Sequence, residues 1–175
     1  MHLTVPRLGD DEIALRPPEP GDVDAITEAC QDPEIPRWTR VPSPYTRAHA
    51  VEFVERSART WERGTDAPFV IVDAETGALL GAIGVHRFGG EDGGPEVGYW
   101  LEREARGRGV ATRALRLVAD WACRELGARL LLQADVHNAA SRRVAEKAQF
   151  QFVGDAKAPA DCGDCETVAV YELNP

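Results

Sequence analysis

Residues 95–112 hold the side chains whose types and spacing point most directly to chemistry. An apolar segment there leads into a basic, glycine-punctuated turn and then into the start of a helix. Gly107 and Gly109 can adopt a positive φ and bring backbone amides close to a ligand, while Arg106 and Arg108 add positive charge. Because the first amides of a helix lack intrahelical partners and lie at the positive end of its dipole, the segment predicts a phosphate-binding turn.

The spacing separates this turn from two other phosphate-binding patterns. The dinucleotide fingerprint needs a third small residue at the position of Thr112, and the nucleotide P-loop needs a Gly-Lys-Ser/Thr ending that does not follow. A third pattern, Arg/Gln-x-x-Gly-x-Gly/Ala, matches residues 106–111 at every fixed position. It resembles the pyrophosphate loop of the GNAT superfamily of acyl-CoA N-acyltransferases.

A second segment carries the same resemblance. The apolar run at residues 130–136 is followed by Asn-x-x-Ser at 138–141 and by Glu-Lys-Ala-Gln-Phe at 146–150, similar to the second signature of the family. With the strand at 96–101, the order and spacing resemble the branch that acetylates N-termini (alanine or serine) of ribosomal proteins, and its small-molecule and protein-acylating relatives. The family usually has glycine at the position of Gln149, so we expect this helix end to be built differently.

The resemblance implies both a fold and a co-substrate. The fold is α/β (α+β), a single GNAT-like domain over residues 1–175, with a mixed, mostly antiparallel sheet of about seven strands, about four flanking helices and splayed central strands. The co-substrate is acetyl-CoA or another acyl-CoA, and no metal is required. The residues implied in cofactor binding are Trp100, Leu101, Arg106, Gly107, Arg108, Gly109, Val110, Ala111, Thr112, Asn138 and Ser141.

Aminolysis of a thioester sets two demands on proton transfer. A lysine amine has a reference pKa of about 10.4, and only the neutral amine attacks, so the site needs a base beside the acceptor and a proton donor near the sulfur. Glu96 is the candidate base, with solvent exposure or simple binding of the ammonium group as the alternatives. The resemblance places the Ser141 hydroxyl near the sulfur, with Tyr99 and Tyr171 in reserve, and a backbone N–H near Leu101 as the oxyanion donor.

Two residue types outside the motifs are given no role in the chemistry. His86 and His137 lie at a strand end and before a helix cap, outside both motif matches. Cys162 and Cys165 form a Cys-x-x-Cys pair. Half of a zinc site or a local disulfide is less favoured than a loop coincidence, because a structural zinc needs four ligands and the other two cysteines, Cys30 and Cys123, are scattered.

Hydrophobic periodicity and turn residues define the elements that must position the site. Residues 32–44 are rich in proline and are expected to be irregular, with Trp38 either bordering the acceptor site or capping the core. Asn138 is expected to cap a helix, and Gly127 to end one. The expected strands are 13–16, 69–72, 78–86, 96–101 and 130–136, and the expected helices are 20–30, 46–63 and 109–126.

Composition limits the classes of partner. The formal net charge of −9 argues against nucleic acid and tilts toward a cationic acceptor. No stretch is long and apolar enough for a membrane span, and the first residues do not resemble a signal peptide, so a cytoplasmic protein without a membrane partner is expected. A homodimer is suggested by family analogy alone.

Three functions therefore compete. The leading one moves an acetyl group from acetyl-CoA by direct attack of a primary amine, which is a protein N-terminus, a lysine or a small amine. A second uses succinyl-CoA or another acyl-CoA, with Arg37, Arg40 or Arg87 as the cation that would select an acidic acyl group. A third is a CoA-sensing module that binds without turnover.

Overall fold

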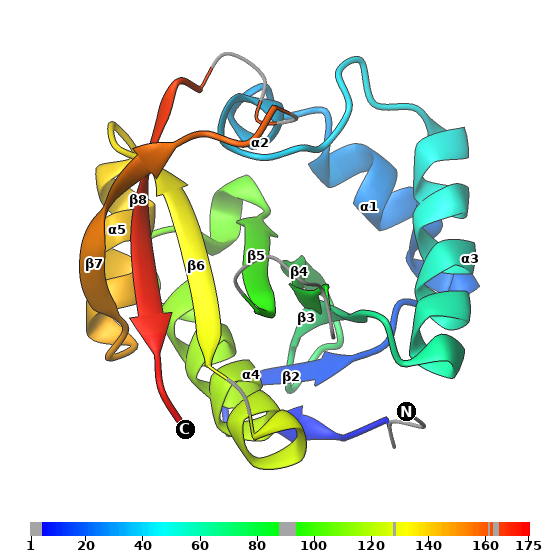
Figure 1. The fold of residues 1–175 in the computed structure, drawn as a ribbon. Coiled ribbons are helices and arrows are strands. Elements are labelled where there is room, and N and C mark those ends of the chain that lie inside the picture. The colour runs from blue at the N-terminus through cyan, green and yellow to red at the C-terminus, as the bar shows by residue number, and fades with distance from the viewer. Residues whose placement is uncertain (1–4, 88–93, 128, 161, 163–164) are drawn as a thin grey trace.

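A computed structural model describes residues 5–87, 94–127, 129–160, 162 and 165–175. One sheet runs through the molecule in the strand order β1-β2-β3-β4-β5-β6-β8-β7 (Figure 1). The strands are β1 Leu8–Gly9, β2 Ile13–Arg16, β3 Ala67–Asp73, β4 Leu79–His86, β5 Glu96–Leu101, β6 Leu130–Asp135, β7 Gln151–Lys157 and β8 Thr167–Leu173. The helices are α1 Val23–Ala29, α2 Glu34–Trp38, α3 Arg47–Arg63, α4 Val110–Leu126 and α5 Ala139–Lys147, with 3-10 turns η1 Pro20–Asp22 and η2 Arg103–Ala105.

The architecture confirms the expected mixed, mostly antiparallel sheet, with two short elements more than the sequence predicted. β1 adds a two-residue edge strand beside β2. The segment expected to be irregular contains α2, in which Glu34 accepts hydrogen bonds from Arg37 Nη1 at 3.1 Å and Trp38 Nε1 at 3.2 Å. Its proline at position 36 falls in the first turn, where a helix does not use the missing amide, so proline content alone was misleading.

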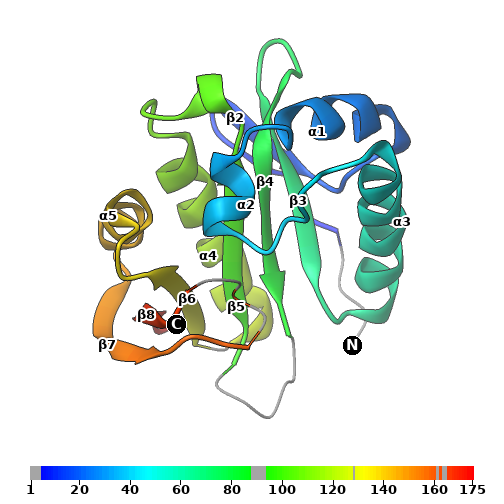
Figure 2. The same ribbon diagram turned by 90° about the horizontal axis from the view of Figure 1, so that it is seen from above.

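The helices cover the two faces of the sheet separately. Figure 2 shows α4 and α5 on one side of the central strands and α1 and α3 on the other. Along β5, Val97, Tyr99 and Leu101 pack into the apolar cluster that includes α4, whereas Trp100 packs against the cluster formed by α1 and α3. Because side chains alternate along a strand, Glu96 and Gly98 share the α1/α3 face with Trp100.

The two central parallel strands diverge. β5 and β6 are registered at one position, Glu96 opposite Leu131, and the Leu131 N–H donates to Pro95 O at 2.8 Å. By contrast, β4 and β5 stay paired from Gly81 opposite Leu101 to His86 opposite Glu96. The sheet is therefore closed at the start of β5 and open toward its carboxyl end, which confirms the expected splay.

The helix ends follow the local signals, with one correction. Thr46 caps α3, and Gly127 ends α4 in the left-handed region with φ 56°. Because Gln149 replaces the usual glycine, the end of α5 was expected to differ from that of the family. Gln149 instead has φ 70°, the left-handed conformation that a glycine would adopt. The departure from glycine changes the local strain rather than the path of the chain.

Candidate active site

The glycine-rich turn has the backbone geometry of an anion site. Gly107 and Gly109 have φ 73° and 79°, and an added Cβ at either position would meet no atom within 4 Å. Gly109 is the N-cap residue of α4 and supplies no side-chain cap, so the first amides of the helix keep their hydrogen-bonding capacity. Val110 and Ala111 are buried at the helix start, which fixes the direction of those amides.

The arginines of the turn are already engaged. Arg106 Nη2 lies 2.9 Å from the Asp32 carboxylate and 2.9 Å from Leu101 O, and Arg103 lies 3.4 Å from the same carboxylate. The Asp32 side chain is only 7% exposed, and a backbone hydrogen bond from Glu34 and the two arginines hold its pKa below the usual range. Arg106 thus ties the turn to the end of β5 and to the α1–α2 connection, a partner that sequence reasoning missed.

Arg108 remains on the outside of the turn. It is exposed, and with Val110 it lines a cavity of about 260 Å³ whose other walls come from β2, β3 and β4 and from the turns before β2 and between β3 and β4. Several carboxylates also line that cavity, including Asp73. The positive potential available to an anion at this turn therefore comes from the α4 amides together with Arg108.

The open side of β5 exposes main-chain groups. The Glu102 N–H donates to Leu80 O at 2.9 Å, so the even-numbered residues of β5 direct their backbone groups toward β4. Tyr99 and Leu101 accordingly direct theirs toward β6, which has already diverged. Leu101 O accepts from Arg106, whereas its N–H and both backbone groups of Tyr99 face the opening between the strands.

A pair of hydroxyls lies across this opening. The Tyr99 hydroxyl donates to Ser141 Oγ at 3.2 Å, and the Ser141 N–H donates to the Asn138 side chain at 3.1 Å, so Asn138 caps α5 as expected. Burial raises the pKa of Tyr99, and the hydrogen bond to Ser141 offsets part of this rise. The phenol therefore stays protonated as a donor, and the Ser141 O–H is free to donate to a ligand atom.

Tyr171, the other tyrosine held in reserve, lies in a different environment. It is fully buried, accepts from Arg142 Nε at 3.2 Å and donates to Glu146 at 3.4 Å. The structure thus brings Tyr99 rather than Tyr171 to Ser141. Spacing along the chain could not distinguish them, because the contact joins β5 to α5.

Glu96 and Trp100 lie on the α1/α3 face, away from the hydroxyl pair. The Glu96 side chain is 14% exposed, and its carboxylate lies 3.7 Å from Arg87 Nη1. Between these two residues, Gly98 is exposed in the middle of a central strand, and an added Cβ there would meet nothing within 4 Å. On the α1/α3 face, β5 therefore presents the Glu96 carboxylate beside the uncovered backbone of Gly98. On the other face, Tyr99 of β5 forms the hydroxyl pair with Ser141.

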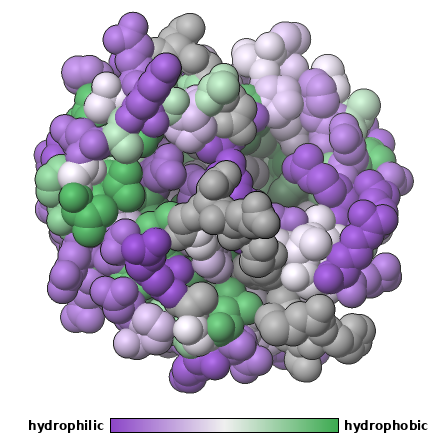
Figure 3. All heavy atoms as spheres, viewed as in Figure 1, coloured by the Kyte–Doolittle hydropathy of each residue, from purple (hydrophilic) through white to green (hydrophobic). Residues whose placement is uncertain are grey.

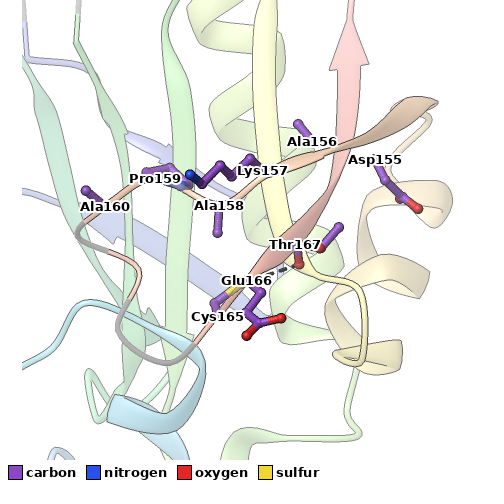
Figure 4. A pocket seen from close by; sticks show the side chains of 9 residues that line it. All are labelled: Asp155, Ala156, Lys157, Ala158, Pro159, Ala160, Cys165, Glu166 and Thr167. Atoms are coloured by element: carbon purple, nitrogen blue, oxygen red, sulfur yellow. Dashed lines mark hydrogen bonds between the residues drawn. The ribbon is translucent and has the colours of Figure 1, made fainter.

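This face is hollowed, with a separate cavity at its margin. Figure 3 shows the hollow between the β6–β8 half and α3, with apolar side chains at its bottom. A cavity of about 750 Å³ lies along the turn between β7 and β8 (Figure 4). It is lined by Asp155, Ala156, Lys157, Ala158, Pro159, Ala160, Cys165, Glu166 and Thr167, none of which is a predicted site residue.

The remaining predicted groups have ordinary partners. Cys162 and Cys165 are free thiols, and Cys165 Sγ donates to Thr167 O at 3.5 Å. Arg37 pairs with Glu34 at 3.1 Å, and Arg87 pairs with Glu96. His137 is exposed, and its N–H donates to Asp135 at 2.8 Å. No described helix has the length and apolar character needed to cross a bilayer.

Comparison with known proteins identifies the family. The model of the acetyltransferase (GNAT) domain matches residues 12–151, so the chain belongs to the GNAT family of N-acetyltransferases. It is 26% identical over 149 residues to the uncharacterized N-acetyltransferase p20 of Bacillus licheniformis, covering 84% of this chain and 83% of p20.

Solved structures agree on the fold. RimL, described as a ribosomal L7/L12 alpha-N-protein acetyltransferase in complex with coenzyme A, superposes with a TM-score of 0.84 at 20% identity, covering 97% of this chain and 98% of RimL. The microcin C7 self-immunity acetyltransferase MccE, in complex with acetyl-CoA and AMP, superposes with a TM-score of 0.83 at 19% identity, covering 95% and 94%. At these identities the likeness establishes the fold.

Proposed function

We propose that this protein transfers an acetyl group from acetyl-CoA to a primary amine by direct attack of the amine on the thioester. The observation that carries the proposal is the divergence of β5 from β6 next to the uncapped start of α4. An extended pantetheine arm fits beside β5 as an added strand, while its pyrophosphate meets the helix amides. The coenzyme A and acetyl-CoA complexes of RimL and MccE support this assignment.

The proposed cofactor contacts follow from the backbone. The amides of Val110, Ala111 and Thr112, with Gly107 and Gly109 permitting close approach, receive the pyrophosphate, and Arg108 adds charge. The open backbone groups of Tyr99 and Leu101 pair with the arm. Arg106 holds the turn in place, and Asn138 holds the start of α5. Trp100 lies on the α1/α3 face, where it lines the approach to the cofactor.

The two proposed catalytic residues lie on opposite faces of the opening. Glu96 lies on the α1/α3 face, where it attracts the ammonium group of the acceptor and takes up its proton. Ser141 lies on the α4/α5 face, where it donates to the thiolate that leaves, and Tyr99 supports it by donating to its oxygen. The Leu101 N–H is the proposed oxyanion donor.

We propose the α-amino group of a protein as the favoured acceptor. The name of RimL describes such an activity, and the acidic net charge of this chain suits a cationic segment behind the amine. Lysine side chains and small amines are the alternatives that the experiment must separate.

The test is release of CoA from acetyl-CoA and succinyl-CoA with ribosomal-protein N-terminal peptides, the same peptides blocked at the N-terminus, polyamines and aminoglycosides. We expect turnover with acetyl-CoA and free N-termini, and an increase in melting temperature on adding CoA alone. A rise in melting temperature without turnover on any amine would favour the CoA-sensing module. No rise at all would refute the proposed cofactor site.

A further inference from the structure

Three titratable side chains, from the residue before β3 and from β4 and β5, form a row on the α1/α3 face of the sheet. Ala67 is registered opposite Val85, which places Asp66 beside His86, and His86 lies directly opposite Glu96. Because alternate residues share a face, this row lies on the same side of the sheet as Gly84, Gly98 and Trp100. His86 is therefore a direct neighbour of the candidate base, although no sequence motif includes it.

The Asp66 carboxylate lies beside Nδ1 of the His86 ring. His86 Nδ1 lies 3.4 Å from Asp66 Oδ1, and the same carboxylate accepts the Arg87 N–H at 3.2 Å. The hydrogen bond from His86 lowers the pKa of Asp66, so the carboxylate stays charged. A charged carboxylate 3.4 Å from Nδ1 favours the proton on that nitrogen, which leaves the lone pair of the neutral ring on Nε2.

The other edge of the ring lies over a glycine. A Cβ built on Gly84 would lie 3.1 Å from both Cε1 and Nε2 of His86, so the ring folds over a position that only glycine leaves open. Gly84 is registered opposite Gly98, whose surface is exposed and whose Cβ position is empty. Gly84 and Gly98 together form a glycine floor, a part of the sheet surface without side chains. An amine that approaches the β5–β6 opening from this face therefore passes over these two glycines, beside His86 Nε2.

His86 also has better access to solvent than Glu96. The exposed fraction of the side chain is 48% for His86 and 14% for Glu96. The charged groups around His86 are Asp66 just before β3, Arg87 next in the chain and Glu96 on β5. The Arg87 N–H donates to Asp66, and the Arg87 side chain pairs with Glu96. A proton received at His86 Nε2 can pass to water because the side chain is exposed. A proton received at Glu96 is less accessible to water and lies beside the Arg87 guanidinium.

We propose that the Asp66–His86 pair is a proton acceptor for the amine, working beside Glu96; this rests on the proposed transferase function. Nε2 removes the proton from the ammonium group, and the neutral amine forms a bond to the thioester carbonyl carbon. The C–S bond breaks and the thiolate takes a proton from Ser141. The second proton lost by the amine nitrogen restores the Ser141 hydroxyl, and the imidazolium returns the first proton to water. In this refinement of the proposed mechanism, His86 rather than Glu96 takes up the proton, Glu96 binds the ammonium group, and Asp66 is a positioning residue.

The kinetic test compares wild type with His86→Gln, His86→Ala and Asp66→Asn, using the pH dependence of kcat/KM for the amine. We expect each variant to lose at least about 10²-fold in kcat/KM at neutral pH, with the acidic limb of the profile altered, and the CoA-induced rise in melting temperature unchanged. Added imidazole should restore activity to His86→Ala. The matched control is His137→Gln, which replaces another exposed histidine and should stay within about twofold of wild type.

A nitrogen-15 NMR spectrum of the imidazole nitrogens separates this proposal from the proposed function. We expect the Nδ1–H tautomer for His86 in wild type and a smaller population of it in Asp66→Asn, because the uncharged amide oxygen attracts the Nδ1 proton less strongly than the carboxylate does. An Nε2–H tautomer in wild type, or an activity loss in His86→Ala that imidazole does not restore, would overturn the proposal while leaving the transferase intact. Wild type inactive on every amine would refute both.

Discussion

The hydroxyl pair of Tyr99 and Ser141 joins residues that are 42 positions apart. Ser141 alone is a weak acid, but an oxygen that accepts a hydrogen bond from a phenol becomes a stronger donor. We therefore expect Ser141→Ala and Tyr99→Phe each to lower kcat by about tenfold or more, with a less than additive loss in the double variant.

Steady-state kinetics with saturating acetyl-CoA would measure this coupling. Tyr171→Phe is the matched control, because that hydroxyl is bound to Arg142 and Glu146, and it should affect stability rather than kcat. Unchanged kcat in both single variants would contradict a role for this pair in protonating the thiolate.

Gln149 has a backbone conformation that suits glycine better. A left-handed residue with a Cβ costs about 1–2 kcal/mol, and glycine gives back about 0.5–1 kcal/mol through the greater freedom of its unfolded chain. We expect Gln149→Gly to raise the free energy of unfolding by about 0.5–1 kcal/mol and the melting temperature by about 2–4 °C, as measured by urea and thermal denaturation. Gln151→Gly, at the start of β7, should instead destabilise the protein, and a similar loss in both variants would refute the argument.

At the scale of elements, the two ends of α4 provide a comparison of glycines. Gly109 at the start has φ 79° and Gly127 at the end has φ 56°, and neither has an atom within 4 Å of an added Cβ. Substitution by alanine should therefore cost about 1 kcal/mol at either position through backbone strain alone. Only Gly109→Ala disturbs the amides proposed to receive pyrophosphate.

Calorimetric titration with CoA would separate the two effects. We expect Gly109→Ala to weaken CoA binding by about tenfold or more and Gly127→Ala to leave it unchanged, with equal losses in melting temperature. Equal affinity of the two variants for CoA would contradict a pyrophosphate site at the start of α4.

Elements set by local signals were predictable from the sequence, whereas relations between elements were not. Gly127 and Asn138 mark helix ends with their own chemistry, and both were placed correctly. The short α2 escaped prediction because its proline at position 36, which suggested irregular structure, falls in the first turn, where a helix does not use the missing amide. The contacts of the site depend on how distant segments are placed side by side. His86 contacts Asp66 and lies opposite Glu96, and Asp32 contacts Arg106. Hydrophobic periodicity reports only local structure, so it could not predict these contacts.

At the scale of the whole molecule, the opening between β5 and β6 can be reached from both faces of the sheet. The α4 start and the hydroxyl pair lie on the α4/α5 face, and Glu96, His86 and the glycine floor lie on the α1/α3 face. A donor and an acceptor that arrive from different faces do not compete for space. Both can therefore be bound when the amine attacks, and no enzyme nucleophile is needed between them.

We accordingly expect a ternary complex in steady-state kinetics. Double-reciprocal plots against acetyl-CoA at several fixed amine concentrations should intersect, because each substrate binds while the other is present. Mass spectrometry of the protein incubated with acetyl-CoA alone should show no acetylated side chain. Parallel lines together with an acetylated residue, for instance at the free thiol of Cys165 beside the β7–β8 cavity, would instead demonstrate a covalent intermediate and would refute direct attack across the sheet.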